Sequence, residues 1–542
     1  MKQEQSSSHT FHHPIIYSFV LILGMYMGFK IASNFYLKQN RFFKSTFNQQ
    51  GDLEYILSII ATKYVDSIDD NKLYDDGIAG LISSLDPHTV YIPPQKTEEV
   101  NNQLEGNLYG VGIEFFIYKD TVRVLSTLPN SPASKSIIRA GDVILKVNDS
   151  LIAGKTISDD QVVNMIKGEV KTKVKLTIMS PDHHIQKVEL FREQIAINSI
   201  EAAYVMPSYN DIGYIRIKLF SENTHKEFKE ALGHLKKQNI TKLIIDVRQN
   251  PGGHMRAVTS ILDELISGSH TLLSTKSKSS VETIVSRNPG IFENEKVCVL
   301  INEASASASE ILAGAIQDLD RGFVIGSRSF GKGLVQEQFP LPNGGALRLT
   351  IARYYLPSGR NIQKDYSNGK VAYMRETYLR HFKSKNKLND SSDVNTQNQF
   401  FTTKKRKVYA NEGISPDFEV LEDSVYYSKA FDSLYQYNLI ELFAAQYYFF
   451  QKNEFKQIQA VTDLIHYSIH DSINEKLFKF IQYEIPTFSK NEFNKHKNKI
   501  DNILLAKFAL YHFSKNEEFL IMGMRDKEIN KAIDVLNTQT LN

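Results

Sequence analysis

The stretch KVCVLINEASASASEILAGAIQDL, residues 296–319, decides the fold of this chain. It opens with the apolar run Val297–Ile301, which is typical of a strand buried on both faces. From Ala308 the apolar residues follow helical spacing, and a serine-rich turn separates the two patterns. A buried strand that passes directly into a helix indicates an α/β layer structure.

Strands and helices alternate on both sides of this stretch, from about residue 212 to residue 355. Such βαβ alternation predicts a sheet with at least partly parallel strands. The predicted strands are Gly213–Ile217, Lys242–Val247 and Lys296–Ile301, and the predicted helices are Thr224–Lys237, Met255–Leu265 and Ala308–Leu319. We place this α/β core at residues 196–422, with a polar, mobile insertion at 383–403.

The remainder of the 542-residue chain divides by pattern into further domains. Residues 105–195 show short β-type runs and one short helix, which together describe a small, partly open β-barrel. The predicted strands there are Val111–Tyr118, Val122–Ser126, Val143–Val147 and Val174–Ile178. Residues 48–104 and 423–542 show helical apolar spacing. We therefore predict a multidomain α/β protein with a helical domain at each end.

Residues 1–47 are predicted to form an N-terminal tail with a membrane anchor. The segment Ile15–Phe29 is strongly apolar and nearly long enough to cross a bilayer of roughly 30 Å. Lys30 can extend its amine to the interface, so the span reaches about residues 14–32. No small-residue cleavage signature follows, which favours an uncleaved anchor over a removed signal peptide. A buried core helix is the alternative.

Charge and cysteine content exclude several classes of function. The formal net charge is only +3, which gives no case for nucleic acid as a partner. A single cysteine, Cys298, excludes an internal disulfide framework and a thiolate-rich metal site. Because it lies within an apolar run, we expect a buried core residue rather than a reactive thiol.

Ser307, the middle serine of the turn, has two possible roles. A serine between a strand and a helix presents its hydroxyl at the positive end of the helix dipole, where the next N–H is free to bind an oxyanion. The sequence Ser307–Glu310 also fits a capping box, with Ser307 as the N-cap. The segment alone leaves both interpretations open and favours capping.

A reactive serine needs a base, and the fifteen histidines show no evident arrangement apart from His254, beside the Asn250–Gly253 turn. Lys332, between two glycines, is the other candidate, because burial or nearby positive charge can lower the pKa of a lysine. Its alternative is a surface lysine in a turn. Gly326–Lys332 also fits a phosphate-binding loop, but Gly333 stands where Ser or Thr would bind Mg²⁺, which disfavours nucleotide binding.

Taken together, roughly residues 50–420 resemble the carboxyl-terminal processing, or tail-specific, serine proteases. The matching motifs follow one another in unbroken order, which makes the resemblance specific. They are Tyr64–Asp66, Leu85–Tyr91, Leu108–Ile113, Ser131–Ala133, Ala140–Leu145, Gly213–Ile215, Asp246–Gly253, Ser305–Glu310, Gln317–Asp318, Phe330–Gln336 and Arg353–Arg360.

The resemblance assigns roles to individual residues. It implies that Ser307 is the nucleophile, that Lys332 is the general base, and that Gln336 helps to orient the lysine. The main-chain N–H groups of Gly253 and Ala308 would form the oxyanion hole. Ser307 would then both begin a helix and attack a carbonyl. No metal or cofactor is required by this chemistry.

The resemblance also implies how substrates bind. Residues 105–195 would be a PDZ domain in which an apolar protein C-terminus docks as an added strand. Its carboxylate would meet the segment Tyr109, Gly110, Val111, Gly112 and Ile113. The partners expected are therefore proteins or peptides with apolar C-termini, and a homo-oligomer is left open.

Two observations bear on localisation and point in opposite directions. More Lys and Arg residues follow the predicted anchor than precede it, so the positive-inside rule alone would keep the protease in the cytoplasm. The resemblance implies a location outside the cytoplasm. We follow the resemblance and expect an inner-membrane anchor with the protease domains in the periplasm.

Two other functions compete with the protease hypothesis. One is a catalytically inactive PDZ receptor for protein tails, against which the presence of Ser307, Lys332 and Gln336 in register speaks. The other is an α/β hydrolase that acts on small esters with a Ser-His-Asp triad.

Overall fold

The computed structural model describes residue 30 and residues 50–287, 289–385, 398–420, 429–467, 469 and 471–539. The chain divides into two compact units, one up to Ser84 and one from Leu85 onward. Apart from Lys30, the predicted anchor at about residues 14–32 lies outside the described residues. Among the helices described, none has both the length and the apolar character needed to span a bilayer.

The first unit contains two described helices, α2 (Gln50–Lys63) and α3 (Asp70–Ile82). Asp69 caps α3, because its carboxylate accepts hydrogen bonds from the N–H groups of Asn71 and Lys72. The helical spacing of this part of the sequence is thus confirmed.

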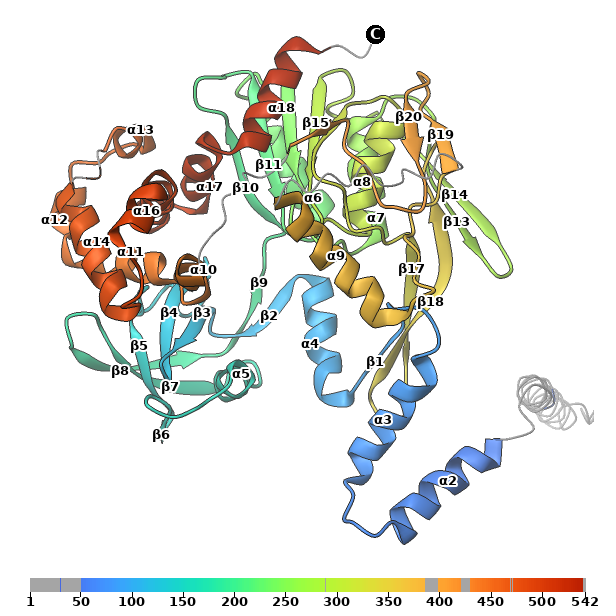
Figure 1. Cartoon of the computed structure of the whole chain (residues 1–542), viewed down its shortest axis with the longest axis horizontal. Helices are drawn as coiled ribbons and strands as arrows, with labels where there is room; N and C mark the ends of the chain where they lie inside the picture. Colours follow the sequence, from blue (N-terminus) through green and yellow to red (C-terminus); the bar gives the residue numbers. More distant parts are fainter. Residues whose placement is uncertain are drawn as a thin grey trace, which may run out of the picture. The chain divides into compact units, whose positions relative to one another are not determined.

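A six-stranded sheet forms the centre of the second unit, in the order β10-β11-β12-β15-β16-β21; Figure 1 labels β10, β11 and β15 of this sheet. Its strands are β10 (Ile200–Val205), β11 (Ile212–Ile217), β12 (Lys242–Asp246), β15 (Lys296–Ile301), β16 (Phe323–Gly326) and β21 (Phe418–Glu419). β10 is antiparallel to β11, and all the other pairs are parallel. The prediction of an α/β sheet with partly parallel strands is confirmed.

Three helices cover one face of this sheet. They are α6 (Thr224–Lys236), α7 (Met255–Leu265) and α8 (Ala308–Asp318). Ile215, Ile245 and Val299 point toward them and are fully buried in their shared core. Because side chains alternate along a strand, the neighbours Tyr214 and Cys298 point to the opposite face.

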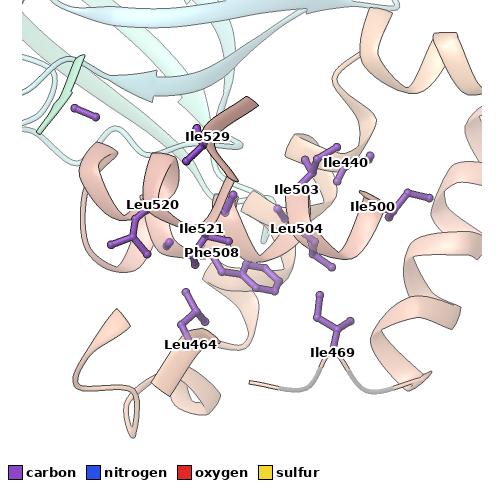
Figure 2. Close-up of a cluster of buried hydrophobic side chains, with 14 of the residues drawn as sticks. Ile440, Leu464, Ile469, Ile500, Ile503, Leu504, Phe508, Leu520, Ile521 and Ile529 are labelled. Atoms are coloured by element: carbon purple, nitrogen blue, oxygen red, sulfur yellow. The ribbon is translucent and has the colours of Figure 1, made fainter. Parts of the chain in front are cut away.

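The C-terminal helices cover that opposite face. Tyr214 and Cys298 are buried in one apolar cluster with residues from these helices. The helices are α10 (Lys429–Gln436), α11 (Leu439–Phe450), α12 (Lys452–Phe455), α13 (Val461–Ile465), α14 (Asp471–Glu484), α15 (Lys490–Lys495), α16 (Lys497–His512), α17 (Lys515–Met524) and α18 (Lys527–Thr538). Figure 2 shows Leu504 and Phe508 of α16 near Ile521 of α17. α17 packs on β10, and α18 packs on β12, β15 and β16 (Figure 1).

The predicted PDZ region forms a separate antiparallel sheet in the order β3-β4-β5-β7-β8. Its elements are β3 (Ile113–Tyr118), β4 (Thr121–Thr127), β5 (Val143–Val147), β6 (Ser150–Leu151, paired with β5), α5 (Asp159–Ile166), β7 (Lys173–Met179) and β8 (Ile185–Phe191). Two short strands, β2 (Asn107–Gly110) and β9 (Glu193–Ala196), pair with each other. The sequence analysis does not identify β8, because only Val188 and Leu190 of that strand are buried.

A third sheet joins distant parts of the second unit, in the order β1-β18-β13-β14 with β17 also paired to β18. Its strands are β1 (Val90–Ile92), β13 (Thr271–Ser277), β14 (Val281–Val285), β17 (Leu334–Pro340) and β18 (Ala346–Tyr355); α4 (Pro94–Glu105) follows β1. In this sheet β1 and β17 lie on opposite edges of β18, and the Gln336 side chain makes a hydrogen bond to the main-chain oxygen of His88, just before β1.

The predicted insertion at 383–403 contains regular structure at both of its ends. α9 (Gly369–Lys385) extends into its beginning, and β19 (Gln399–Phe401), paired with β20 (Lys407–Tyr409), lies at its end. Residues 386–397 lie outside the described residues.

Candidate active site

Three loops meet at one edge of the central sheet. They follow β12, β15 and β16 and contain the Gly252–Gly253 turn, Ser307 and Lys332 respectively. Because these strands are parallel neighbours, their carboxyl ends lie side by side, where open α/β sheets commonly bind ligands.

Ser307 is the N-cap of α8, as the capping interpretation predicts. The Glu310 carboxylate accepts a hydrogen bond from the Ser307 N–H at 2.8 Å. The backbone of Ser307 has a φ of 55°, a value that is uncommon for serine and occurs where the surroundings enforce it. The residue remains partly exposed at the start of a helix that is otherwise buried along its whole length.

The same Glu310 carboxylate also holds the segment that contains Lys332. The oxygen that accepts from Ser307 accepts from the N–H of Lys332 at 2.8 Å, and the other oxygen accepts from Gly331 N and Ser329 Oγ, each at 2.6 Å. Glu310 is fully buried, and burial raises the pKa of its carboxyl while these hydrogen bonds oppose the rise. One side chain therefore fixes the main chains of Ser307 and Lys332 beside each other.

The amine of Lys332 lies in a mostly buried environment. Burial, with the positive charge of Arg348 as a second cause, lowers the pKa of Lys332 to about 8, while Glu310 and Asp86 oppose the shift. The amine donates a hydrogen bond to the Gln336 side-chain oxygen at 2.8 Å. Among the described residues, no hydrogen bond joins this amine to the Ser307 hydroxyl; such contacts are often long before substrate binds.

The Gly252–Gly253 turn packs directly against the start of α8. A β-carbon at Gly252 would lie 2.7 Å from the Ser307 β-carbon and 3.0 Å from the Ala308 nitrogen. Both glycines have positive φ values, 100° and 139°. In the part of the chain that the structure describes, the N–H groups of Gly253 and Ala308 have no hydrogen-bond acceptor. Two free main-chain donors thus lie next to Ser307, an arrangement that suits an oxyanion.

Two residues with no role assigned from the sequence complete the surroundings of Lys332. The main-chain oxygen of His88 accepts a hydrogen bond from the Gln336 amide. The Tyr354 hydroxyl donates to the Lys332 main-chain oxygen at 2.7 Å. His88 belongs to the motif Leu85–Tyr91 and Tyr354 to the motif Arg353–Arg360, both quoted above. The resemblance therefore included both residues but gave neither of them a role.

His254, the alternative base, occupies a different position. It is the N-cap of α7, and its ring Nε2 lies 3.2 Å from the main-chain oxygen of Leu104. Within the described ranges, no three His, Cys, Asp or Glu side chains gather in a way that would hold a metal ion.

The predicted tail-binding segment runs from the end of β2 into β3. Tyr109 and Gly110 end β2, Val111 and Gly112 form the connection, and Ile113 begins β3. Gly112 has a φ of 75°, and a β-carbon there would lie 2.3 Å from that of Ser131. Among the described strands, β3 pairs only with β4, so no strand occupies its outer edge, the kind of edge to which a peptide can add as a strand.

Known proteins resemble this chain over the same regions. The family model for Peptidase family S41 matches residues 211–373, and that for the PDZ domain matches residues 99–179. A carboxy-terminal-processing protease of Bartonella bacilliformis is 33% identical over 328 residues, which is 59% of this chain and 74% of that protein. The carboxy-terminal processing protease CtpB of Bacillus subtilis is 30% identical over 329 residues, 60% of this chain and 68% of that protein.

Among solved structures, a photosystem II D1 C-terminal processing protease is 26% identical, with 68% of this chain and 86% of that chain covered. Its TM-score of 0.35 is too low to support an argument about shape. The sequence relatives and the two family models agree on one class of enzyme. This chain belongs to the carboxy-terminal-processing proteases of peptidase family S41 and is a serine-type peptidase with a PDZ domain.

Proposed function

We propose that this peptidase works through a Ser307–Lys332 dyad and selects proteins that end in an apolar C-terminal tail. The observation that supports this best is the environment of Lys332. A buried amine whose pKa is about 8 is partly uncharged near neutral pH, and only the uncharged amine can accept a proton from a hydroxyl.

In the proposed reaction, the Ser307 oxygen attacks the substrate carbonyl while its proton passes to the Lys332 amine. The negative charge on the carbonyl oxygen is stabilised by the N–H groups of Gly253 and Ala308. The Lys332 ammonium then returns the proton to the leaving amine, which departs and leaves an ester on Ser307. A water molecule, deprotonated by Lys332, hydrolyses that ester.

Gln336 orients the amine in this scheme. Its side-chain oxygen accepts from the Lys332 amine at 2.8 Å, and its amide nitrogen donates to the main-chain oxygen of His88. The second contact fixes which end of the amide faces the lysine, because a main-chain oxygen can only accept. Gln336 is therefore a positioning residue rather than a reacting one.

The tail would bind along the outer edge of β3, antiparallel or parallel to it, with its carboxylate at residues 109–113. Main-chain hydrogen bonds to β3 would provide affinity, and alternate apolar side chains would face the barrel. Such a contact fixes the C-terminus of a substrate and so favours cleavage near it.

The test combines variants of the dyad with substrates that differ only in their tails. Ser307→Ala and Lys332→Ala should each reduce kcat at least 10³-fold, roughly the loss seen when a member of such a unit is removed. Binding of a fluorescent apolar-tailed peptide should stay within about twofold, because the PDZ contacts remain. Ser279→Ala and Lys278→Ala, in the exposed β13–β14 turn, serve as matched controls.

Mass spectrometry of the products locates the cleavage site, and a substrate with a charged last residue should show a higher KM. Cleavage that persists in Lys332→Ala would exclude the dyad and make His254 the next base to test. Tail binding by the unaltered protein without any cleavage would favour the alternative function, an inactive PDZ receptor.

We further propose that residues of about 14–32 anchor the protein in the inner membrane with the protease domains in the periplasm. The apolar segment Ile15–Phe29 supports the anchor, and membership of this family motivates the orientation. External protease added to spheroplasts should degrade the domains if they face the periplasm; protection of the intact chain would place them in the cytoplasm instead.

A further inference from the structure

The turn that contains Gly252 and Gly253 is linked to the C-terminal helices through the side chain of Arg248. Arg248 lies four residues before Gly252, and its side chain lines a cavity together with residues of α18. Its guanidinium contacts Asp526 at 2.7 Å and also Glu528. These two carboxylates stand at the start of α18, nearly 280 residues further along the chain.

Arg248 depends on these carboxylates for its charge balance. Its third carboxylate partner, Asp246, lies 2.6 Å away and is fully buried, but Asp246 also pairs with Arg216 at 3.0 Å. Only 13% of the Arg248 side chain is exposed. Without Asp526 and Glu528, a mostly buried guanidinium would share a single carboxylate with a second arginine, which is costly.

Glu528 touches a second catalytic loop as well. Its carboxylate lies 3.2 Å from the position that a β-carbon at Gly326 would take. Gly326 ends β16, so the loop that leads to Lys332 starts there, and its φ is 125°. The start of α18 therefore contacts the first residues of the loops that contain Gly253 and Lys332.

A cavity marks the same junction. It measures about 290 Å³ and is lined by residues from the starts of all three catalytic loops and from α17 and α18. The loop residues include Arg248, Asn302 and Ser327, and the helix residues include Met522, Asp526 and Glu528. A cavity thus lies between the catalytic loops and the C-terminal helices, and the contacts of Arg248 with Asp526 and Glu528 join its two sides.

The turn is also hydrogen-bonded to residues on either side of Ser307. Asn250 accepts hydrogen bonds through its main-chain oxygen from Ala306 N at 3.0 Å and Ser309 Oγ at 2.9 Å. Its side-chain oxygen accepts from Gly252 N at 2.8 Å. A shift of Arg248 would therefore affect both the Gly253 donor and the residues on either side of Ser307.

From this geometry we infer that Asp526 and Glu528 are positioning residues of the active site, which hold the oxyanion turn through Arg248. The C-terminal helical region is on this account part of the catalytic apparatus and not a separate module. The inference rests on the proposed function, because it assumes that Gly253 N stabilises the oxyanion.

The experiment uses full-length protein and isosteric variants. Asp526→Asn removes the charge but keeps the cap of α18, since asparagine caps as well as aspartate; the Asp526 carboxylate accepts from Glu528 N at 2.9 Å. Glu528→Gln keeps the side-chain size. The matched control is Asp534→Asn, on an exposed position of the same helix.

We normalise kcat to the number of active sites titrated with a fluorophosphonate. In the double variant we expect this kcat to fall roughly tenfold or more. The fall should be smaller than the one caused by removing an oxyanion-hole donor altogether. KM for an apolar-tailed peptide should change less than about twofold, because neither Asp526 nor Glu528 makes a hydrogen bond or ion pair with residues 109–113 in the described part of the chain. Glu528→Asp, which keeps a carboxylate, should retain more activity than Glu528→Gln. Normalisation to titrated sites removes any effect of misfolded protein.

An unchanged kcat in the double variant, with Ser307→Ala inactive, overturns this inference and leaves the proposed function intact. Equal losses in kcat for the double variant and Asp534→Asn overturn it too, because they indicate a general effect of charge on α18. Full activity in Ser307→Ala would instead overturn the proposed function itself.

Discussion

At the residue scale, Glu310 explains why a sequence that fits a capping box also fits an active site. Its carboxylate accepts from Ser307 N, as a residue at the third helical position does in a capping box, and from Lys332 N as well. Capping and catalysis are therefore compatible at this position. The same carboxylate organises the helix start and places the candidate base.

The pH dependence of cleavage tests the role of Lys332. Since burial and Arg348 lower the pKa of Lys332 to about 8, the fraction of uncharged amine rises with pH through that value. We expect kcat/KM to increase from pH 6, to reach half of its maximum near pH 8 and to level off about one pH unit higher. Arg348→Gln removes the positive charge that lowers this pKa, so the profile should move to higher pH and activity at pH 7 should fall roughly two- to tenfold.

Arg353→Gln is the control for that shift, since Arg353 lies on the same strand, β18, and is not among the causes of the Lys332 shift. The comparison requires cleavage rates of the unaltered protein and of both variants, measured from pH 5.5 to 10 with one peptide substrate. A profile that falls between pH 7 and 9, or one that Arg348→Gln leaves unmoved, would contradict the assignment of Lys332 as the base.

Sequence reasoning identified residues of the candidate site where they form continuous motifs. It could not identify contacts between distant segments. The hydrogen bond from Gln336 to the His88 main-chain oxygen spans 248 positions, and the pairing of Arg248 with Asp526 spans 278. Neither contact has a periodicity or a motif of its own, because only the folded sheet brings the segments together.

At the element scale, β11, β12 and β15 and the helices α6, α7 and α8 were predicted nearly to the residue, whereas β10, β16 and β21 of the same sheet were not predicted. β15 and α7 begin and end where the apolar patterns do. These elements are buried on both faces or along a broad stripe, and such burial leaves a strong pattern in the sequence. β8 was missed for the opposite reason, since most of its side chains are exposed.

The conformation of Gln336 shows a further limit of the sequence. The residue lies in a strand, β17, at a point where the register with β18 shifts between Val335 and Gln336. Such a bulge redirects a side chain without a clear sequence signature. The sequence alone did not decide whether Gln336 follows Lys332 by a helical or an extended step.

The connection between β2 and β3 provides a test of tail recognition. Gly112→Ala places a methyl group 2.3 Å from the Ser131 β-carbon at a φ of 75°, so the segment 109–113 must move. We expect KM for an apolar-tailed substrate to rise roughly tenfold, with little change in kcat, since a loss of uniform binding raises KM alone.

Gly154→Ala is a close control, because Gly154 has a φ of 71° in the same domain but nothing within 4 Å of a new β-carbon. It reproduces the backbone strain without the clash. Kinetics on tailed and tail-free peptides separate the two effects. If Gly112→Ala weakened cleavage of both peptides equally, the segment would not be the tail site.

At the scale of the whole molecule, two different parts of the chain cover the two faces of the central sheet. α6, α7 and α8 lie on one face, and the C-terminal helices supply the apolar residues on the other. The sequence indicated helices from residue 423 onward but not their purpose. The structure shows that they complete the core of the second unit.

The reactivity of the Cys298 thiol tests whether the C-terminal helices stay packed on the central sheet. Cys298 is the single cysteine of the chain, fully buried between β15 and the C-terminal helices, and burial raises the pKa of its thiol, so almost no thiolate forms. We expect the thiol of the native protein to react with a disulfide reagent at least 10³ times more slowly than a free thiol.

With increasing urea, labelling of Cys298 should begin at the same concentration at which peptidase activity is lost, because helices and sheet share one core. A cysteine placed at Ser279 in a Cys298→Ala background, in an exposed turn, gives the rate for an accessible thiol. Rapid labelling at urea concentrations where activity persists would mean that the C-terminal helices detach from a working enzyme.

The shared anchor at Glu310 has a consequence for motion. Because one buried carboxylate binds the main chains at Ser307 and at Lys332, a displacement of either segment must stretch a charge-assisted hydrogen bond to the other. Thermal fluctuations of the two segments should therefore be correlated, because both segments are bonded to the same carboxylate. Distortions that arrive from elsewhere in the molecule would shift hydroxyl and amine together and leave their separation nearly constant.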